Sequence, residues 1–169
     1  AIAIEAMSYL KEKINKAFEL VFVGPINNDK LKENLLNKIN EFKLQDNIKF
    51  VGPSKKMNLI YSVADIVLSC STDPEAFGRI PVEAQSMGKI IIASDHGGHK
   101  ETVYEGISGF LYDPNQPQDL ADAILKVLVS EQYLDKSYQL KRRNLIIENY
   151  TVEKMCQQTL EIYNKVLVA

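Results

Sequence analysis

The feature that most constrains the fold of this chain is an alternation of two hydrophobic patterns. Short apolar runs with the length of β-strands are followed by longer stretches in which apolar residues recur every three to four positions, as on one face of a helix. The apolar runs span residues 18–23, 48–51, 65–70 and 89–93, and a glycine-punctuated extended segment spans 102–111. Strands that alternate with helices predict an α/β domain in which helices flank a parallel sheet.

The helix-type stretches fill the intervals between these runs. The stretch at 29–43 is expected to bury one stripe, and the unbroken apolar centre of the 65–70 run is typical of a strand buried on both faces. The last stretch should break near Tyr150, with Thr151 starting a closing helix over 151–168. The predicted helices span residues 1–16, 29–43, 57–63, 78–87, 117–129 and 131–167, and the stripe consists of Leu31, Leu35, Leu36, Ile39 and Phe42.

Length and charge narrow the class of protein. A length of 169 residues suits one domain, and we expect residues 1–169 to form it. The 20 basic and 22 acidic residues leave a net charge of −2, so the chain lacks the excess of positive charge that is typical of nucleic-acid-binding proteins. No apolar run approaches the roughly 20 residues of a membrane span and no signal peptide opens the chain, so a cytoplasmic protein is expected. The first helix lacks an initiator Met and a capping residue, which indicates a piece of a longer chain.

The cysteines and histidines do not form a metal-binding pattern. Cys70 and Cys156 lie far apart without a Cys-x-x-Cys spacing, and both are expected to be small buried apolar residues. His96 and His99 flank a Gly-Gly turn, where we expect histidines to take no chemical part, and Asp95 is expected to cap that turn.

Loops that follow the strands are the places to look for a binding site, because ligands of open α/β sheets bind at the carboxyl ends of the strands. The most informative loop follows Cys70. Pro81 has no N–H to donate and fits only the first turn of a helix, so that helix should begin near Gly78. The N–H groups of Arg79 and Ile80 would then point out of its positive N-terminus, where a diphosphate could bind, and Gly78 would allow close approach.

Two acidic residues bracket this expected phosphate site. Glu75 lies in the loop before the helix, and Glu83 lies in its opening turns. A carboxylate can accept hydrogen bonds from two adjacent hydroxyls of a ribose or hexose, so the pair suggests a nucleotide diphosphate sugar. The alternative is a structural role, since a glutamate near a helix N-terminus gains about 0.3–1 kcal/mol from the helix dipole without any ligand.

Residues 75–83 (EAFGRIPVE) resemble the E-x7-E motif of retaining glycosyltransferases of family 4. The likeness extends over the segments 50–71, 83–103 and 106–125, and to the closing helix at 151–167. By this resemblance the chain is the C-terminal, donor-binding half of a GT-B fold. That fold consists of two Rossmann-like domains, and the N-terminal acceptor domain is absent from this sequence.

The resemblance implies a role for each matching position. Glu75 would lie beside the donor sugar as the catalytic acidic residue, and Glu83 would hold the ribose hydroxyls. Backbone groups at the helix tip would bind the sugar and the diphosphate, and the loop after Val51 would meet the nucleobase. For Arg79 we expect the N–H, and not the side chain, to be the useful group. The helix-tip residues are Phe77, Gly78, Arg79 and Ile80, and the loop residues are Gly52, Pro53, Ser54 and Lys55.

The reaction implied by the resemblance moves a sugar from a nucleotide diphosphate sugar to an acceptor hydroxyl with retained anomeric configuration. No metal or other cofactor is implied, since the chain has no Asp-x-Asp arrangement. The acceptor would be a glycan or lipid on the N-terminal domain, as in glycan or lipopolysaccharide biosynthesis, and peripheral membrane association of the full-length protein is compatible with that. The family's cationic diphosphate-binding residues lie upstream of Ala1, so we expect this chain alone to lack transferase activity.

Two other functions fit the same residues. One is a nucleotide-sugar epimerase or a sugar-phosphate synthase on the same fold, and the other is a non-catalytic nucleotide-binding module. An epimerase would need general bases around the sugar, whereas a binding module of another kind would have no need of Glu83.

Overall fold

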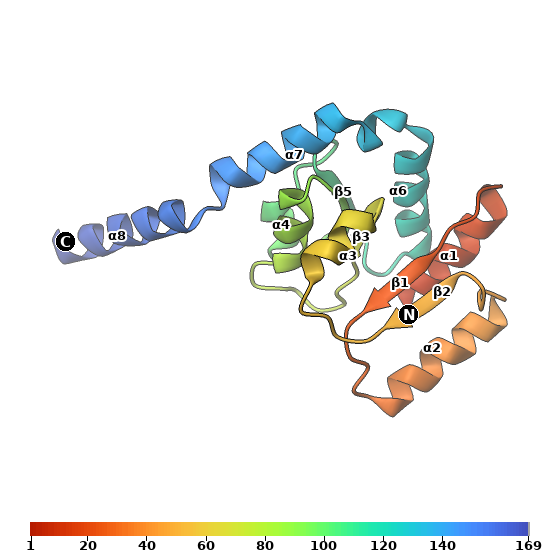
Figure 1. Cartoon of the computed structure of the whole chain (residues 1–169). Coiled ribbons are helices and arrows are strands. Elements are labelled where there is room, and N and C mark those ends of the chain that lie inside the picture. The colour runs from red at the N-terminus through yellow and green to blue at the C-terminus, as the bar shows by residue number, and fades with distance from the viewer. Residues whose placement is uncertain (169) are drawn as a thin grey trace.

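The structure, a computed structural model, describes residues 1–168, with the backbone alone for residues 131 and 168 (Figure 1). Each predicted strand and helix has a counterpart, most with slightly shorter bounds, and the α/β class with parallel strands is confirmed. The extended segment predicted at 102–111 is a strand only from residue 109, and Thr102 ends a short helix that was not predicted. The strands are β1 (Leu20–Val23), β2 (Ile48–Val51), β3 (Ile66–Ser69), β4 (Ile90–Ser94) and β5 (Gly109–Tyr112). The helices are α1 (Ile2–Lys13), α2 (Asp29–Glu41), α3 (Met57–Val63), α4 (Arg79–Ser86), α5 (His99–Thr102), α6 (Pro117–Val129), α7 (Lys136–Asn149) and α8 (Val152–Val168), with a 3-10 turn at Glu131–Leu134.

The strands form two parallel sheets, where the alternation had predicted one. β1 pairs with β2, and β3, β4 and β5 form a second sheet in that order. Within residues 1–168, β1 and β3 each have a strand neighbour on one side only. In the larger sheet Ser69 lies opposite Ala93, so β3 and β4 end side by side. The loops that follow these two strands therefore leave the sheet at the same edge and next to each other.

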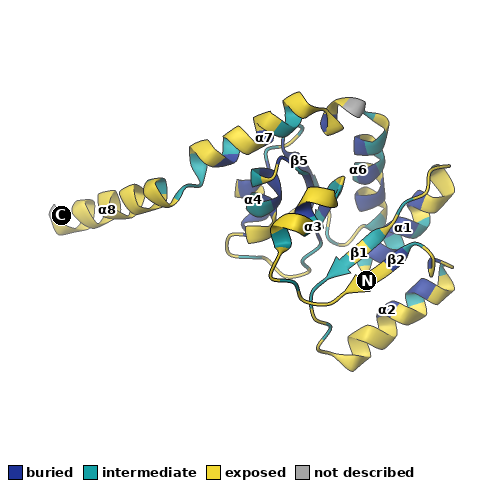
Figure 2. Ribbon diagram, in the orientation of Figure 1, coloured by how far each residue is buried: buried dark blue, intermediate teal, exposed yellow. Residues whose placement is uncertain are grey.

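Strand β4 is the centre of the larger sheet and is buried along its whole length, whereas α8 is largely exposed (Figure 2). Ile90 and Ile92 belong to the apolar cluster that includes α1 and α6. Ile91 and Ala93 point the other way, into a second cluster with side chains of α3 and α4. Burial on both faces was predicted for the 65–70 run, but there Ile66 is half-buried, because β3 is an edge strand of its sheet.

Two further predictions about burial are wrong in part. On α2, Leu35 and Ile39 are buried, but Leu31 and Leu36 are 47% and 44% exposed, because α2 packs against α1 and lies beside a sheet of only two strands (Figure 1). Cys156 was expected to be buried and is exposed, since α8 extends away from the rest of the domain (Figure 1).

Cys70 is half-buried, and burial raises the pKa of its thiol.

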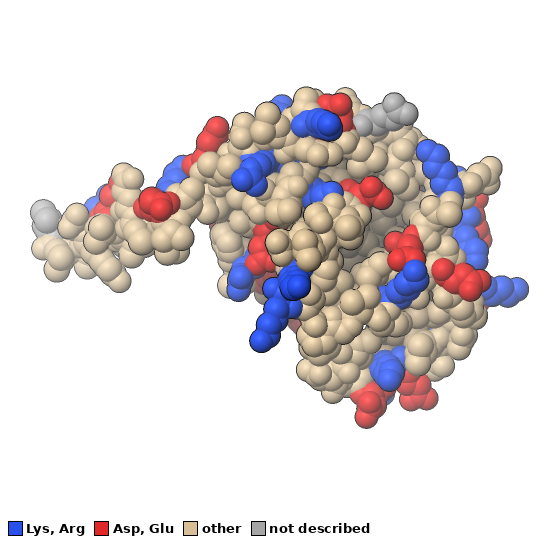
Figure 3. All heavy atoms as spheres, in the orientation of Figure 1, with Lys and Arg blue, Asp and Glu red and all other residues tan. Residues whose placement is uncertain are grey.

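None of the described helices is both long enough and apolar enough to cross a membrane. Basic and acidic side chains are interspersed over the face drawn in Figure 3. No patch of a single sign dominates that face, in keeping with the nearly balanced charge of the sequence.

A buried arginine on α7 binds the segments that precede β4 and β5, at the amino ends of these strands. Arg142 is 1% exposed and donates hydrogen bonds to the carbonyl oxygens of Gly88 (2.9 Å), Tyr133 (2.8 Å) and Ile107 (3.5 Å). No carboxylate pairs with it among the described residues. Burial lowers the pKa of its guanidinium to about 10, which leaves it charged at neutral pH.

Replacing Arg142 with Met should destabilise the fold by about 2–4 kcal/mol, because three carbonyls would lose a charged donor that water cannot readily replace. The neighbouring Arg143→Met is the matched control. Arg143 is exposed and donates one hydrogen bond, to the carbonyl of Ser86, so its loss should cost less than about 1 kcal/mol. Urea unfolding followed by circular dichroism measures both values, and equal losses would contradict the role given to Arg142.

Candidate functional site

The candidate site is built around the N-terminus of α4, which begins where the sequence predicted. Gly78 is the N-cap, with a left-handed φ of 76°, and no described side chain caps the helix. A Cβ at this position would lie 2.8 Å from Cδ2 of His99, so both the backbone angle and the space require glycine. Among the described side chains, none occupies the hydrogen-bonding positions of the first N–H groups, those of Arg79 and Ile80. They form an uncapped, electropositive tip.

Glu83 is held by donors from two helices. The Tyr61 hydroxyl on α3 donates to Glu83 Oε2 over 3.1 Å, and Arg79 Nη2 lies 2.9 Å from Oε1. Burial, followed by the contact with Glu83, raises the pKa of Tyr61 to about 12. The Arg79 side chain, expected to take no part, therefore forms an ion pair, although at 85% exposure the pair contributes little stability. Glu83 keeps 37% of its side chain exposed and can accept further hydrogen bonds.

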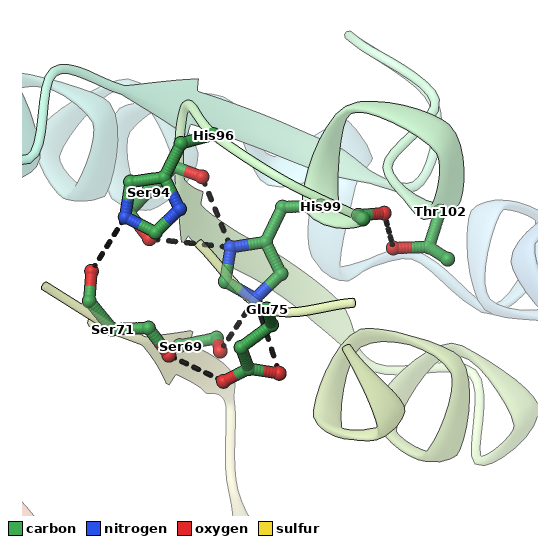
Figure 4. A network of polar contacts seen from close by, with 8 residues as sticks. Ser69, Ser71, Glu75, Ser94, His96, His99 and Thr102 are labelled. Carbon is green, nitrogen blue, oxygen red and sulfur yellow. Dashed lines mark hydrogen bonds and ion pairs between the residues drawn. The ribbon is translucent and has the colours of Figure 1, made fainter. Parts of the chain in front are cut away.

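Glu75 lies in the loop between β3 and α4, and contacts fix both its backbone and its side chain (Figure 4). The N–H of Gly98 donates to the Glu75 carbonyl oxygen over 2.7 Å. The Ser71 hydroxyl donates to Oε1, and Oε2 lies 3.9 Å from Nε2 of His99. The side chain is 33% exposed, so the carboxylate is oriented and still accessible.

The two glycines after β4 allow the Glu75 loop to lie directly on the turn. A Cβ at Gly97 would lie 2.4 Å from the carbonyl oxygen of Glu75, and a Cβ at Gly98 would lie 2.5 Å from the backbone of Phe77. These obstacles are main-chain atoms that a side chain could not push aside. The Gly-Gly pair, predicted only as a polar turn, is the packing contact that brings the loops after β3 and β4 together.

The remaining predicted residues lie beside this centre. Phe77 is 44% exposed, and its ring meets that of Tyr150 edge-on with a centroid distance of 5.7 Å. The loop of Gly52, Pro53, Ser54 and Lys55 joins β2 to α3, and the Ser54 hydroxyl accepts a hydrogen bond from the Lys56 N–H over 3.0 Å. Since α3 carries Tyr61 to Glu83, the loop is connected to the site through that helix.

Sequence reasoning missed His99, which is completely buried beneath the site. Its Nδ1 lies 3.0 Å from the carbonyl oxygen of Ser94, and its Nε2 lies 3.1 Å from the hydroxyl of Ser69. His96 also contacts the site loop, through Nε2 and the carbonyl oxygen of Ser71, at 2.9 Å. The sequence signal was only partial: the SDHGGH segment follows a predicted strand, but the pairing of that strand with β3 comes from the structure. No group of three or more His, Cys, Asp or Glu side chains placed to hold a metal occurs in the described part of the chain.

Comparisons with known proteins find relatives of this chain. The family model described as "Glycosyl transferases group 1" matches residues 1–151. The crystal structure of a glycosyltransferase from Rickettsia africae superimposes with a TM-score of 0.85 and 34% identity, over 98% of this chain and 44% of that one. Anabaena HepE in complex with UDP-glucose gives 0.83 and 26%, over 97% and 44%. A D-inositol 3-phosphate glycosyltransferase from Mycolicibacterium vanbaalenii is 36% identical over 101 residues, which are 59% of this chain and 22% of that protein.

The matched part is less than half of the length of each of these three relatives, from 22% to 44%. Within this chain, however, the family model spans α1 to α7 and thus every residue of the candidate site. The chain belongs to the group 1 glycosyl transferase family.

Proposed function

We propose that this chain is the donor-binding domain of a retaining, family 4 glycosyltransferase of the GT-B fold, which transfers a sugar from a nucleotide diphosphate sugar to an acceptor hydroxyl. The observation that carries the proposal is the uncapped tip of α4 at Gly78 with an oriented, accessible carboxylate on either side of it. The Anabaena relative, solved with UDP-glucose, supports a nucleotide sugar as the donor.

Each part of the site has a task in this reaction. The diphosphate binds at the α4 tip, where the N–H groups of Arg79 and Ile80 and the helix dipole favour an anion. Glu83, already oriented by Tyr61, accepts hydrogen bonds from the ribose hydroxyls. Glu75 accepts hydrogen bonds from the donor sugar and stabilises the positive charge that develops on its ring as the leaving phosphate departs. Gly52, Pro53, Ser54 and Lys55 contact the base.

Other parts of the full-length protein would complete the reaction. An N-terminal domain would bind the acceptor, a glycan or lipid of a cell-surface polysaccharide or lipopolysaccharide pathway, and would allow the protein to associate peripherally with a membrane in the cytoplasm. Cationic residues upstream of Ala1 would neutralise the diphosphate, so residues 1–169 alone should lack transferase activity. No metal takes part, because the helix N–H groups and these cations would stabilise the leaving group.

A nucleotide-sugar epimerase is the second enzyme candidate, and it makes a different product. Incubating the full-length protein with a nucleotide sugar and no acceptor would convert the sugar into its epimer if general bases surround it. The transferase proposal expects the nucleotide sugar to be recovered unchanged apart from slow hydrolysis.

Calorimetric titration with UDP, GDP and ADP should identify the donor base, and we expect UDP to bind most tightly, as the Anabaena relative suggests. A protein extended upstream to include the cationic residues should bind the same nucleotide more tightly, because charged hydrogen bonds to phosphate are added. Failure of all three nucleotides to bind either protein would overturn the proposal.

Glu83→Ala should weaken nucleotide diphosphate binding by about 1–3 kcal/mol, since the ribose hydroxyls lose a charged partner. Glu33→Ala is the matched control, because Glu33 is an exposed glutamate on α2, and its change should leave the affinity unaltered. The same titration measures both variants. If Glu83→Ala bound as the unchanged chain does, the nucleotide would bind elsewhere, as the binding-module alternative expects.

A further inference from the structure

A buried polar cluster lies beneath the site and has no part in the function proposed above. Ser69 ends β3, Ser94 ends β4, and His99 begins α5; all three are at most 1% exposed. The His99 ring lies between the two serines, in contact with both strand ends (Figure 4). Burying polar groups costs free energy unless hydrogen bonds compensate, and apolar residues fill the neighbouring positions of β4. Space filling alone therefore does not account for the cluster.

The hydrogen bonds of His99 fix the orientation of its ring. Nδ1 lies 3.0 Å from the Ser94 carbonyl oxygen and 3.2 Å from the Ser94 hydroxyl, so both of its neighbours belong to Ser94. A carbonyl oxygen can only accept, so a hydrogen bond to it requires the proton on Nδ1, and we assign the tautomer on that basis. Nε2 is then directed to the opposite side, toward the Ser69 hydroxyl at 3.1 Å. The histidine thus bridges β3 and β4 at the edge where the site is built.

The same edge of the ring faces the carboxylate of Glu75 and the backbone of Gly78 at the tip of α4. Nε2 lies 3.9 Å from Oε2 of Glu75, the carboxylate oxygen that Ser71 does not hold. Cδ2 of His99 lies directly under Gly78, and a Cβ added to Gly78 would be only 2.8 Å from it. His99 also directly follows Gly98 in the sequence, and the N–H of Gly98 donates a hydrogen bond to the Glu75 carbonyl oxygen. One short segment therefore fixes the backbone of Glu75 and bounds the position of its carboxylate.

We propose that His99 is a positioning residue that sets the carboxylate of Glu75 against the donor sugar. The inference rests on the proposed function, because it assigns His99 to the sugar end of that site. Glu83 has its own support in Tyr61, and α4 packs mainly against α7 and β4 and only slightly against α5. Loss of the Nε2 contact should therefore affect recognition of the sugar and spare recognition of the nucleotide.

Two substitutions separate the two ends of the imidazole. In His99→Asn the amide can still donate to the Ser94 carbonyl, but nothing reaches Ser69 or Glu75. In His99→Gln the longer side chain places an amide where Nε2 lay. The ligands are whichever of UDP, GDP or ADP binds and the matching nucleotide sugar, which is UDP-glucose, GDP-mannose or ADP-glucose. We expect His99→Asn to raise the Kd of the nucleotide sugar about tenfold and the Kd of the nucleotide by less than about twofold. His99→Gln should recover most of the loss.

Thermal melting of each variant accompanies the titrations, and Ser69→Ala provides a second route should His99→Asn not fold. It leaves the ring bonded to Ser94, removes the partner of Nε2, and should shift the nucleotide-sugar Kd in the same direction. The inference is overturned if His99→Asn and Ser69→Ala leave the ratio of the two Kd values unchanged, whether both affinities fall together or neither changes. Glu75→Gln separates failure of the proposed function from failure of the role of His99. If Glu75→Gln has no effect on nucleotide-sugar binding, the proposed function of Glu75 fails. If it weakens that binding and His99→Asn does not, only the role of His99 fails.

Discussion

The parallel pairing of β3 with β4 is the interaction on which the rest of the site depends. β4 is buried on both faces and so cannot shift without exposing one apolar cluster or the other. Its register with β3 places Ser69 opposite Ala93, which brings the ends of the two strands to one edge. The backbone of the loop that carries Glu75 then lies directly against the turn that carries Gly97 and Gly98. Only glycines leave enough room for this contact.

The electrostatic character of the site follows from the kind of donors that hold its acidic residues. Ser71 orients Glu75, and Tyr61 orients Glu83, through neutral hydroxyl groups. A neutral donor fixes the direction of a carboxylate without cancelling its charge, whereas a buried cation would do both. Among the side chains that the structure describes, the one full cation bonded to either carboxylate is Arg79, which is largely exposed and screened by solvent. Both carboxylates therefore keep the capacity to accept hydrogen bonds from sugar hydroxyls at either side of an electropositive helix end.

Much of the fold was predictable because it depends on local pattern. The spacing of apolar residues located every strand and every α-helix except the four-residue α5, and Pro81 with Gly78 located the start of α4 to within one residue. The errors arose where burial depends on the partner of an element and not on its own sequence. Leu31 has the spacing of a buried residue on α2, yet the sheet beneath that helix has only two strands. Cys156 has the burial habit of its residue type, yet α8 extends away from the domain.

The site shows the same limit at the level of single residues. Glu75, Gly78 and Glu83 lie within nine positions of one another, so their relation could be predicted along the chain. His99 lies 24 positions from Glu75 and becomes its neighbour only through the register of β3 and β4, which no local pattern specifies.

The two acidic residues have separate supports, and that separation is a physical property of the site. Tyr61 reaches Glu83 from α3, and the ring of His99 lies by Glu75 from α5, so the supporting side chains belong to different elements and share no hydrogen-bond partner. Groups that share no partner perturb one another weakly, and the effects of changing them approach additivity. A donor with a nucleotide at one end and a sugar at the other meets such a site as two nearly independent halves joined at the α4 tip. On the proposed function, variation in the support of Glu75 would then alter the sugar that is accepted without loss of the nucleotide affinity assigned to Glu83 and the helix.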